Sequence, residues 1–141
     1  MDRKGSAVWQ GDLKTGKGTV ATESGALKDA RYSFSTRFEN GAGTNPEELV
    51  AAAHAGCFSM ALSGQLGEAK LTPTSVRTTA TVTIERVEGG FTVTKVHLDV
   101  AAKVPGASQA AFDKAAANAK AGCPISRLLK AEITMTAKLE A

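Results

Sequence analysis

A long apolar segment in the middle of the chain constrains the fold more than any other feature. It begins at Pro46, runs to about Leu66 or Gly67, and carries alanine, leucine, valine, phenylalanine and methionine on nearly every side of a helical projection. Asn45 as N-cap, Pro46 at N1 and Glu48 at N3 form a capping-box-like start. Because a helix that is apolar all round must be covered on all sides, we expect it to be buried at the centre of the fold.

Short segments rich in threonine and valine, separated by glycine-containing turns, predict β-strands on both sides of this helix. The apolar phase slips between Val93 and Val96, which predicts a β-bulge near Thr94 or Lys95. The expected strands are a meander over Ala7–Gln10, Thr19–Thr22 and Arg31–Phe38, a hairpin of Thr74–Val87 with Phe91–Val104, and a last strand over Glu132–Leu139.

Two further helices are expected in the C-terminal half. Ser108 caps an alanine-rich helix that runs to about Ala121, and Cys123-Pro124 starts a short helix that runs through about Leu129. Strands, helix, strands, helices and strand in one chain predict an α+β fold with antiparallel sheets around the central helix, in a single domain over residues 1–141.

The composition excludes several classes of function. The net charge is +3 with scattered basic residues, which argues against nucleic-acid binding. We find no stretch that approaches the ~20 apolar residues needed to cross a membrane, and the segment from Met1 to Asp12 lacks the apolar core of a secretion signal. We therefore expect a cytoplasmic protein without membrane partners. Aromatic residues make up only 5% of the chain, so the core is light and a dimer interface would stabilise it.

The chain has two cysteines, Cys57 and Cys123, and no Cys-x-x-Cys motif. In a reducing cytosol such a pair is free, metal-binding or redox-active rather than a permanent bridge. Cys123 precedes Pro124 at a helix start, where the backbone helps to stabilise a thiolate. Cys57 lies mid-helix, where burial alone raises the pKa of the thiol. If Cys57 is reactive, a side-chain cation must reach it.

Arg37 is the candidate cation, because it ends a predicted strand just before the loop that leads into the helix. A buried arginine requires a carboxylate partner, and Glu48 is close in sequence. Glu48 and Cys57 are nine positions apart, which is about 180° round a helix and ~13 Å along it. Either Arg37 bridges a long gap, or the Arg37–Glu48 pair serves the Cys57 of a second chain.

Two cysteine motifs with their flanking residues match a known family. The chain strongly resembles the osmotically inducible protein C and organic hydroperoxide resistance family, and the osmotically inducible protein C branch in particular. The similarity covers nearly the whole chain. It is carried by Gly43–Val50, Ala52–Leu62 with the run His54-Ala55-Gly56-Cys57-Phe58, Ala121–Ser126 and Leu129–Thr134.

The resemblance implies a thiol-dependent peroxidase that prefers organic hydroperoxides, uses no cofactor or metal, and works as an intertwined homodimer with sites at the interface. It implies that Cys57 is the peroxidatic thiol, Cys123 the resolving thiol, Arg37 the activating cation and Glu48 its orienting carboxylate. It also implies that a dithiol, of lipoyl type rather than glutathione, reduces the resulting disulfide. Apolar walls would hold the organic group, and we expect them to include Phe38, Phe58 and Leu128.

Other interpretations of the same residues remain open. Both cysteines are consistent with inert core thiols of a non-catalytic structural or ligand-binding stress protein, and without the family match Cys123 would be the favoured nucleophile. His54 with Cys57, Cys123 and His97 is the alternative of a zinc site. More simply, His54 is a helix histidine with a backbone or interface partner, and His97 faces solvent. The position of Glu47 in the first helical turn is explained by its favourable interaction with the helix macrodipole alone.

Overall fold

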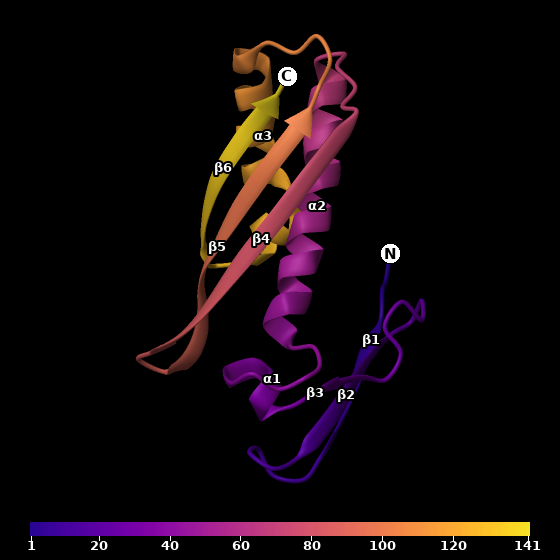
Figure 1. Ribbon diagram of the computed structural model, residues 1–141, viewed down its shortest axis with the longest axis vertical. Helices are drawn as coiled ribbons and strands as arrows, with labels where there is room; N and C mark the ends of the chain where they lie inside the picture. Colours follow the sequence, from indigo (N-terminus) through magenta and orange to yellow (C-terminus); the bar gives the residue numbers. More distant parts are fainter. The chain divides into compact units, whose positions relative to one another are not determined.

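The computed structural model describes all residues, 1–141, and confirms the α+β class (Figure 1). The chain forms two compact units, Met1–Leu49 and Val50–Ala141. Each unit contains one three-stranded sheet. The prediction of a single domain over residues 1–141 stays a prediction.

The first unit is a β-meander followed by a short helix. Strands β1 (Gly5–Gln10), β2 (Lys17–Thr22) and β3 (Ala30–Tyr32) pair antiparallel in that order. This confirms the meander, but the prediction of a strand over Arg31–Phe38 is wrong beyond Tyr32. Residues Phe34–Phe38 form helix α1 instead.

A capping box explains why the strand gives way to a helix. The Ser33 hydroxyl accepts a hydrogen bond from the Thr36 backbone N–H (3.3 Å), and the Thr36 hydroxyl accepts one from the Ser33 backbone N–H (2.8 Å). These two reciprocal bonds satisfy backbone donors that a helix start would otherwise leave unpaired. The Ser-x-x-Thr signal overrides the strand propensity of the two phenylalanines, and Arg37 lies on a helix as a result.

Helix α2 (Pro46–Glu68) confirms the predicted long helix. Asn45 Oδ1 accepts a hydrogen bond from the Glu48 backbone N–H (2.8 Å), as expected of an N-cap. Burial on all sides is wrong for the single chain, because only one stripe is buried and Met60 is 80% exposed. The buried stripe repeats every fourth residue: His54, Phe58, Leu62 and Leu66.

The apolar character of α2 also corrects the expectation that no stretch approaches membrane-spanning length. By length and composition alone this 23-residue helix could cross a membrane. Core helices of soluble proteins have the same length and composition, so this property does not distinguish between the two.

The second unit contains a mixed sheet of β4 (Ser75–Val87), β5 (Gly90–Lys103) and β6 (Glu132–Glu140), in that order. The hairpin of β4 and β5 contains the predicted bulge, because Thr83 pairs with Lys95 and Ile84 with Val93, which leaves Thr94 without a partner. Strand β6 pairs with β5 in parallel, so the prediction of purely antiparallel sheets is wrong. The two helices between β5 and β6 provide the crossover that a parallel connection requires.

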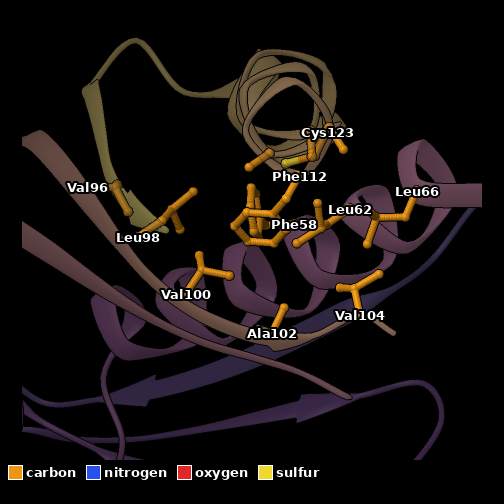
Figure 2. Packing of buried hydrophobic residues seen from close by; sticks show 13 residues of the cluster. Phe58, Leu62, Leu66, Val96, Leu98, Val100, Ala102, Val104, Phe112 and Cys123 are labelled. Carbon is orange, nitrogen blue, oxygen red and sulfur yellow. The ribbon is translucent and has the colours of Figure 1, made fainter. Parts of the chain in front are cut away.

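Those two helices are α3 (Gln109–Gly122) and α4 (Pro124–Leu128), and Ser108 caps α3 as predicted. Side chains from α2, β5 and α3 converge in one dry core, with Cys123 at its edge (Figure 2). The core packs α2, which carries Cys57, against the segment that carries Cys123. Its members are Phe58, Leu62, Leu66, Val96, Leu98, Val100, Ala102, Val104, Phe112, Ala115, Ala116, Ala119 and Cys123.

Candidate active site

Both cysteines lie in the second unit, and both are free thiols. Cys57 is partly exposed on α2, whereas Cys123 is 1% exposed at the junction of α3 and α4. The Cys57 thiol interacts with the Cys123 thiol and accepts a hydrogen bond from the Ile125 backbone N–H. The fold therefore brings together two thiols that are 66 positions apart in the sequence.

The pKa of the Cys57 thiol is raised above its usual range. Burial is the main cause, and the neighbouring Cys123 raises the pKa further, while the hydrogen bond from the Ile125 N–H acts in the opposite direction. This confirms the expectation that burial raises the pKa of Cys57. No cation is among the causes of this shift.

Cys123 takes part in a chain of buried hydrogen bonds. Its Sγ accepts from the Ser126 backbone N–H (3.4 Å), and its S–H donates to Ser126 Oγ (3.1 Å). Ser126 Oγ in turn lies 2.8 Å from His54 Nε2. The sequence predicted a backbone or interface partner for His54 and missed Ser126.

His54 is completely buried, and burial lowers the pKa of its imidazole. Its Nδ1 atom has no hydrogen-bond partner. His54 therefore remains a neutral base at physiological pH, with one ring nitrogen engaged by Ser126 and the other unpaired.

Arg37 and its carboxylate partner lie in the first unit. Arg37 donates to Glu47 through Nε (3.3 Å to Oε2) and Nη2 (2.5 Å to Oε1). The Glu48 carboxylate instead accepts a hydrogen bond from the Thr44 hydroxyl at 2.7 Å. The predicted Arg37–Glu48 pair is therefore wrong, and so is the view that Glu47 serves only the macrodipole. Consecutive helical residues point about 100° apart, so only one of the two carboxylates faces Arg37.

A pocket of ≈ 250 Å³ opens beside Arg37. The Arg37 guanidinium lies over the Phe38 ring, 5.1 Å from its centroid, and both residues line the pocket. Phe38 thus lies where an apolar wall was expected. Phe58 does not, because it is fully buried in the core, and Leu128 is 72% exposed and outside this pocket. The remaining lining residues are Trp9, Leu13, Tyr32, Ser33 and Phe34.

The alternative of a metal site gains no geometric support. No group of three or more His, Cys, Asp or Glu side chains is arranged to hold a metal ion. His97 uses both ring nitrogens for hydrogen bonds with the hydroxyls of Thr134 (2.6 Å) and Thr136 (3.2 Å).

Comparison with known proteins relates this chain to one family. Residues 39–138 match the family model for OsmC-like proteins. The chain is 56% identical over 140 residues to peroxiredoxin OsmC of Escherichia coli, covering 99% of this chain and 98% of that protein. It is 36% identical over 100 residues to an organic hydroperoxide resistance protein of Xanthomonas axonopodis pv. citri, covering 70% of this chain and 68% of that protein.

Solved structures agree with this relationship. An organic hydroperoxide resistance protein from Elizabethkingia anophelis superposes with a TM-score of 0.74 at 25% identity, covering 97% of this chain and 96% of that chain. An OsmC-like protein from Vibrio cholerae gives a TM-score of 0.78 at 17% identity, covering 98% and 99%. At that lower identity the likeness concerns the fold alone.

Proposed function

Because this chain belongs to the OsmC-like protein family and is a cysteine-based peroxidase, we propose that it reduces organic hydroperoxides to alcohols through a Cys57–Cys123 disulfide. The interaction between the two free thiols in the second unit is the observation that carries this proposal. The preference for organic substrates is supported by a relative named for organic hydroperoxide resistance. The alternative of a non-catalytic stress protein with inert thiols does not explain why the two thiols meet.

The proposed reaction has three steps. The Cys57 thiolate attacks one peroxide oxygen, the O–O bond breaks, and the departing alkoxide takes up a proton, which leaves Cys57 as a sulfenic acid. Cys123 then attacks the sulfenic sulfur, which forms the disulfide and releases water. An external dithiol, which we propose to be of lipoyl type, reduces the disulfide by thiol–disulfide exchange. No cofactor is required, and we place the reaction in the cytoplasm.

We assign Arg37 as the activating cation, and Glu47 in place of Glu48 as the carboxylate that orients it. The two hydrogen bonds between Arg37 and Glu47 fix the guanidinium plane, as a fork-to-carboxylate pair does. An oriented guanidinium can stabilise the Cys57 thiolate and donate to the polarising O–O bond. The aromatic pocket beside Arg37 has the apolar character that an organic group requires.

We propose a homodimer in which the exposed face of α2 packs against a second copy. In the single chain this face carries Met60 at 80% exposure, and nothing lies within 4 Å of a Cβ built on Gly56, Gly64 or Gly67. Glycine inside a helix costs about 1 kcal/mol relative to alanine. Glycines on an otherwise open face are therefore explained by the close approach of another helix.

Two experiments test the dimer and its site. Sedimentation equilibrium should give twice the mass of one chain, and association should be weakened strongly by Gly64→Leu and weakly by Gly64→Ala, in the order of the side-chain volume added to the helix face. A mixed dimer of a Cys57→Ser chain with an Arg37→Ala chain then distinguishes a site completed in trans from one completed in cis. A trans site retains one working centre, and a cis site retains none.

The peroxidase proposal is tested by the consumption of cumene hydroperoxide and of hydrogen peroxide with dihydrolipoamide as reductant. We expect the organic peroxide to be removed faster, and both activities to be lost in Cys57→Ser. Equal background rates in the parent protein and in Cys57→Ser, with both proteins folded, would favour the non-catalytic alternative.

A further inference from the structure

The proposed reaction leaves one buried group of the second unit without a role. His54 is completely buried, and its Nδ1 is the one buried side-chain nitrogen or oxygen without a hydrogen-bond partner. Nearly all buried polar groups in folded proteins are paired, because an unpaired one destabilises the fold. A leucine would suit this position on the apolar stripe of α2, so the imidazole calls for an explanation.

The hydrogen bonds around Ser126 fix the direction in which protons are shared. Ser126 Oγ makes two side-chain hydrogen bonds, one with Cys123 Sγ at 3.1 Å and one with His54 Nε2 at 2.8 Å. When the Cys123 S–H donates to Ser126 Oγ, the single hydroxyl proton of Ser126 is directed at His54 Nε2. His54 is then the acceptor at the end of the chain, and Nδ1 carries the ring proton.

All three side chains are shielded from water. His54 is 0% exposed, Cys123 is 1% exposed and Ser126 is 8% exposed. Because Cys123 is shielded from solvent, a hydrogen-bonded side chain is the nearest acceptor for its proton when it becomes a thiolate. The hydrogen bonds of Ser126 define a side-chain path from Cys123 Sγ to His54 Nε2.

We propose that Ser126 and His54 act as a buried proton relay that makes Cys123 a competent resolving thiol. As Cys123 Sγ attacks the sulfenic sulfur of Cys57, the thiol proton moves to Ser126 Oγ and the Ser126 proton moves to His54 Nε2. The S–S bond forms, the S–O bond breaks, and the departing hydroxide combines with one proton from the His54 imidazolium as water. Ser126 contacts the reacting sulfur of Cys123 directly, whereas His54 acts through Ser126 and is a positioning residue. This proposal rests on the proposed function of the two cysteines.

The relay is tested by separating the two chemical steps. The reduced protein is mixed with one equivalent of cumene hydroperoxide, and the Cys57 sulfenic acid is trapped with dimedone while disulfide formation is followed by quenched-flow mass spectrometry. His54→Gln retains an amide group that can bond to Ser126 but cannot take a proton. Ser126→Ala removes the bridge, and Ser126→Thr restores the hydroxyl.

We expect disulfide formation to slow about 100-fold in His54→Gln and Ser126→Ala, at the lower end of the range of general acid–base catalysis. Sulfenic acid formation should stay within about 2-fold of the parent rate, and Ser126→Thr should recover the second step. Thermal unfolding of each variant controls for loss of structure. Second-step rates equal to the parent rate in both variants would overturn the relay. Absence of both sulfenic acid and disulfide in the peroxide-treated parent protein would instead overturn the proposed function.

Discussion

The unit Val50–Ala141 buries thirteen apolar side chains in one cluster, whereas in Met1–Leu49 the only buried side chain is that of Thr36. The first unit is held by a capping box, by the Arg37–Glu47 ion pair and by the Trp9–Tyr32 ring contact. Small units without a core are marginal on their own. The two thiols therefore lie in a unit that its own apolar core stabilises. Arg37 lies in a unit that depends on local polar contacts and on packing against other surfaces.

Loss of Cys57, the proposed peroxidatic thiol, should have the largest effect. Cys57→Ser is expected to reduce hydroperoxide turnover to background, because the serine hydroxyl is not a nucleophile at its ordinary pKa. Cys123→Ser should retain one fast turnover and stop at the sulfenic acid, which dimedone trapping detects. If Cys123→Ser lost the first turnover and Cys57→Ser kept it, the assigned roles would be reversed.

Damage to the core of the second unit should have the next largest effect. Phe58→Ala is expected to lower the free energy of unfolding by about 3–5 kcal/mol, because the side chain is fully buried at the centre of the cluster. Val87→Ala, at a position 42% exposed, should change it by less than about 0.5 kcal/mol. Denaturant unfolding measures both. Similar losses for the two variants would mean that the second unit lacks the self-supporting core described above.

The polar support of the first unit should show a smaller and more selective effect. Glu47→Gln is expected to slow hydroperoxide reduction about 10-fold, because a hydrogen bond to a charged group contributes roughly 1.5–3 kcal/mol and part of the Arg37 fork survives. Glu48→Gln is the matched control and should stay within about 2-fold of the parent. Steady-state kcat/KM measures both. A larger loss of kcat/KM in Glu48→Gln than in Glu47→Gln would indicate that Glu48 orients Arg37, as the sequence predicted.

The buried histidine should give the smallest effect, as a pH dependence of stability. The pKa of His54 is lowered in the folded state, so below about pH 6.5 the unfolded chain binds a proton that the folded chain does not. Stability should therefore be complete above that pH and fall as the pH is lowered towards the folded pKa. Thermal unfolding between pH 7.5 and pH 5 measures this loss, and it should be smaller in His54→Gln. An unchanged slope in His54→Gln would assign the pH dependence to other groups.

Local signals predicted most of the second unit. The alternation of apolar residues located β4 and β5, the slip of phase located the bulge at Thr94, and Ser108 located the start of α3. The direction of β6 was missed, because the alternation of a strand is the same in either orientation and only the tertiary crossover decides it. The sequence also did not predict that only one side of α2 is buried. An apolar helix face indicates that something must cover it, but the pattern does not tell whether the same chain or another one does so.

Side-chain pairing was harder to predict than secondary structure. Arg37 was singled out, but its partner depended on α1, which the Ser33–Thr36 capping box creates and which the sequence interpretation treated as a strand. The predicted partner of Arg37 was therefore wrong by one position on α2, with Glu48 in place of Glu47. Ser126 was missed because its contact with His54 joins residues 72 positions apart, and no local pattern reports such a contact.

We infer that Cys57 and Cys123 form a disulfide when the protein reduces an organic hydroperoxide. The most direct measurement treats the fully reduced protein with one equivalent of cumene hydroperoxide in the absence of reductant, digests it under non-reducing conditions and maps the linked peptides by mass spectrometry. We expect a single peptide pair joining Cys57 to Cys123, formed as the peroxide is consumed and reversed by dihydrolipoamide. Peroxide consumption with both thiols still free, or with cross-links only between identical cysteines of two chains, would contradict it.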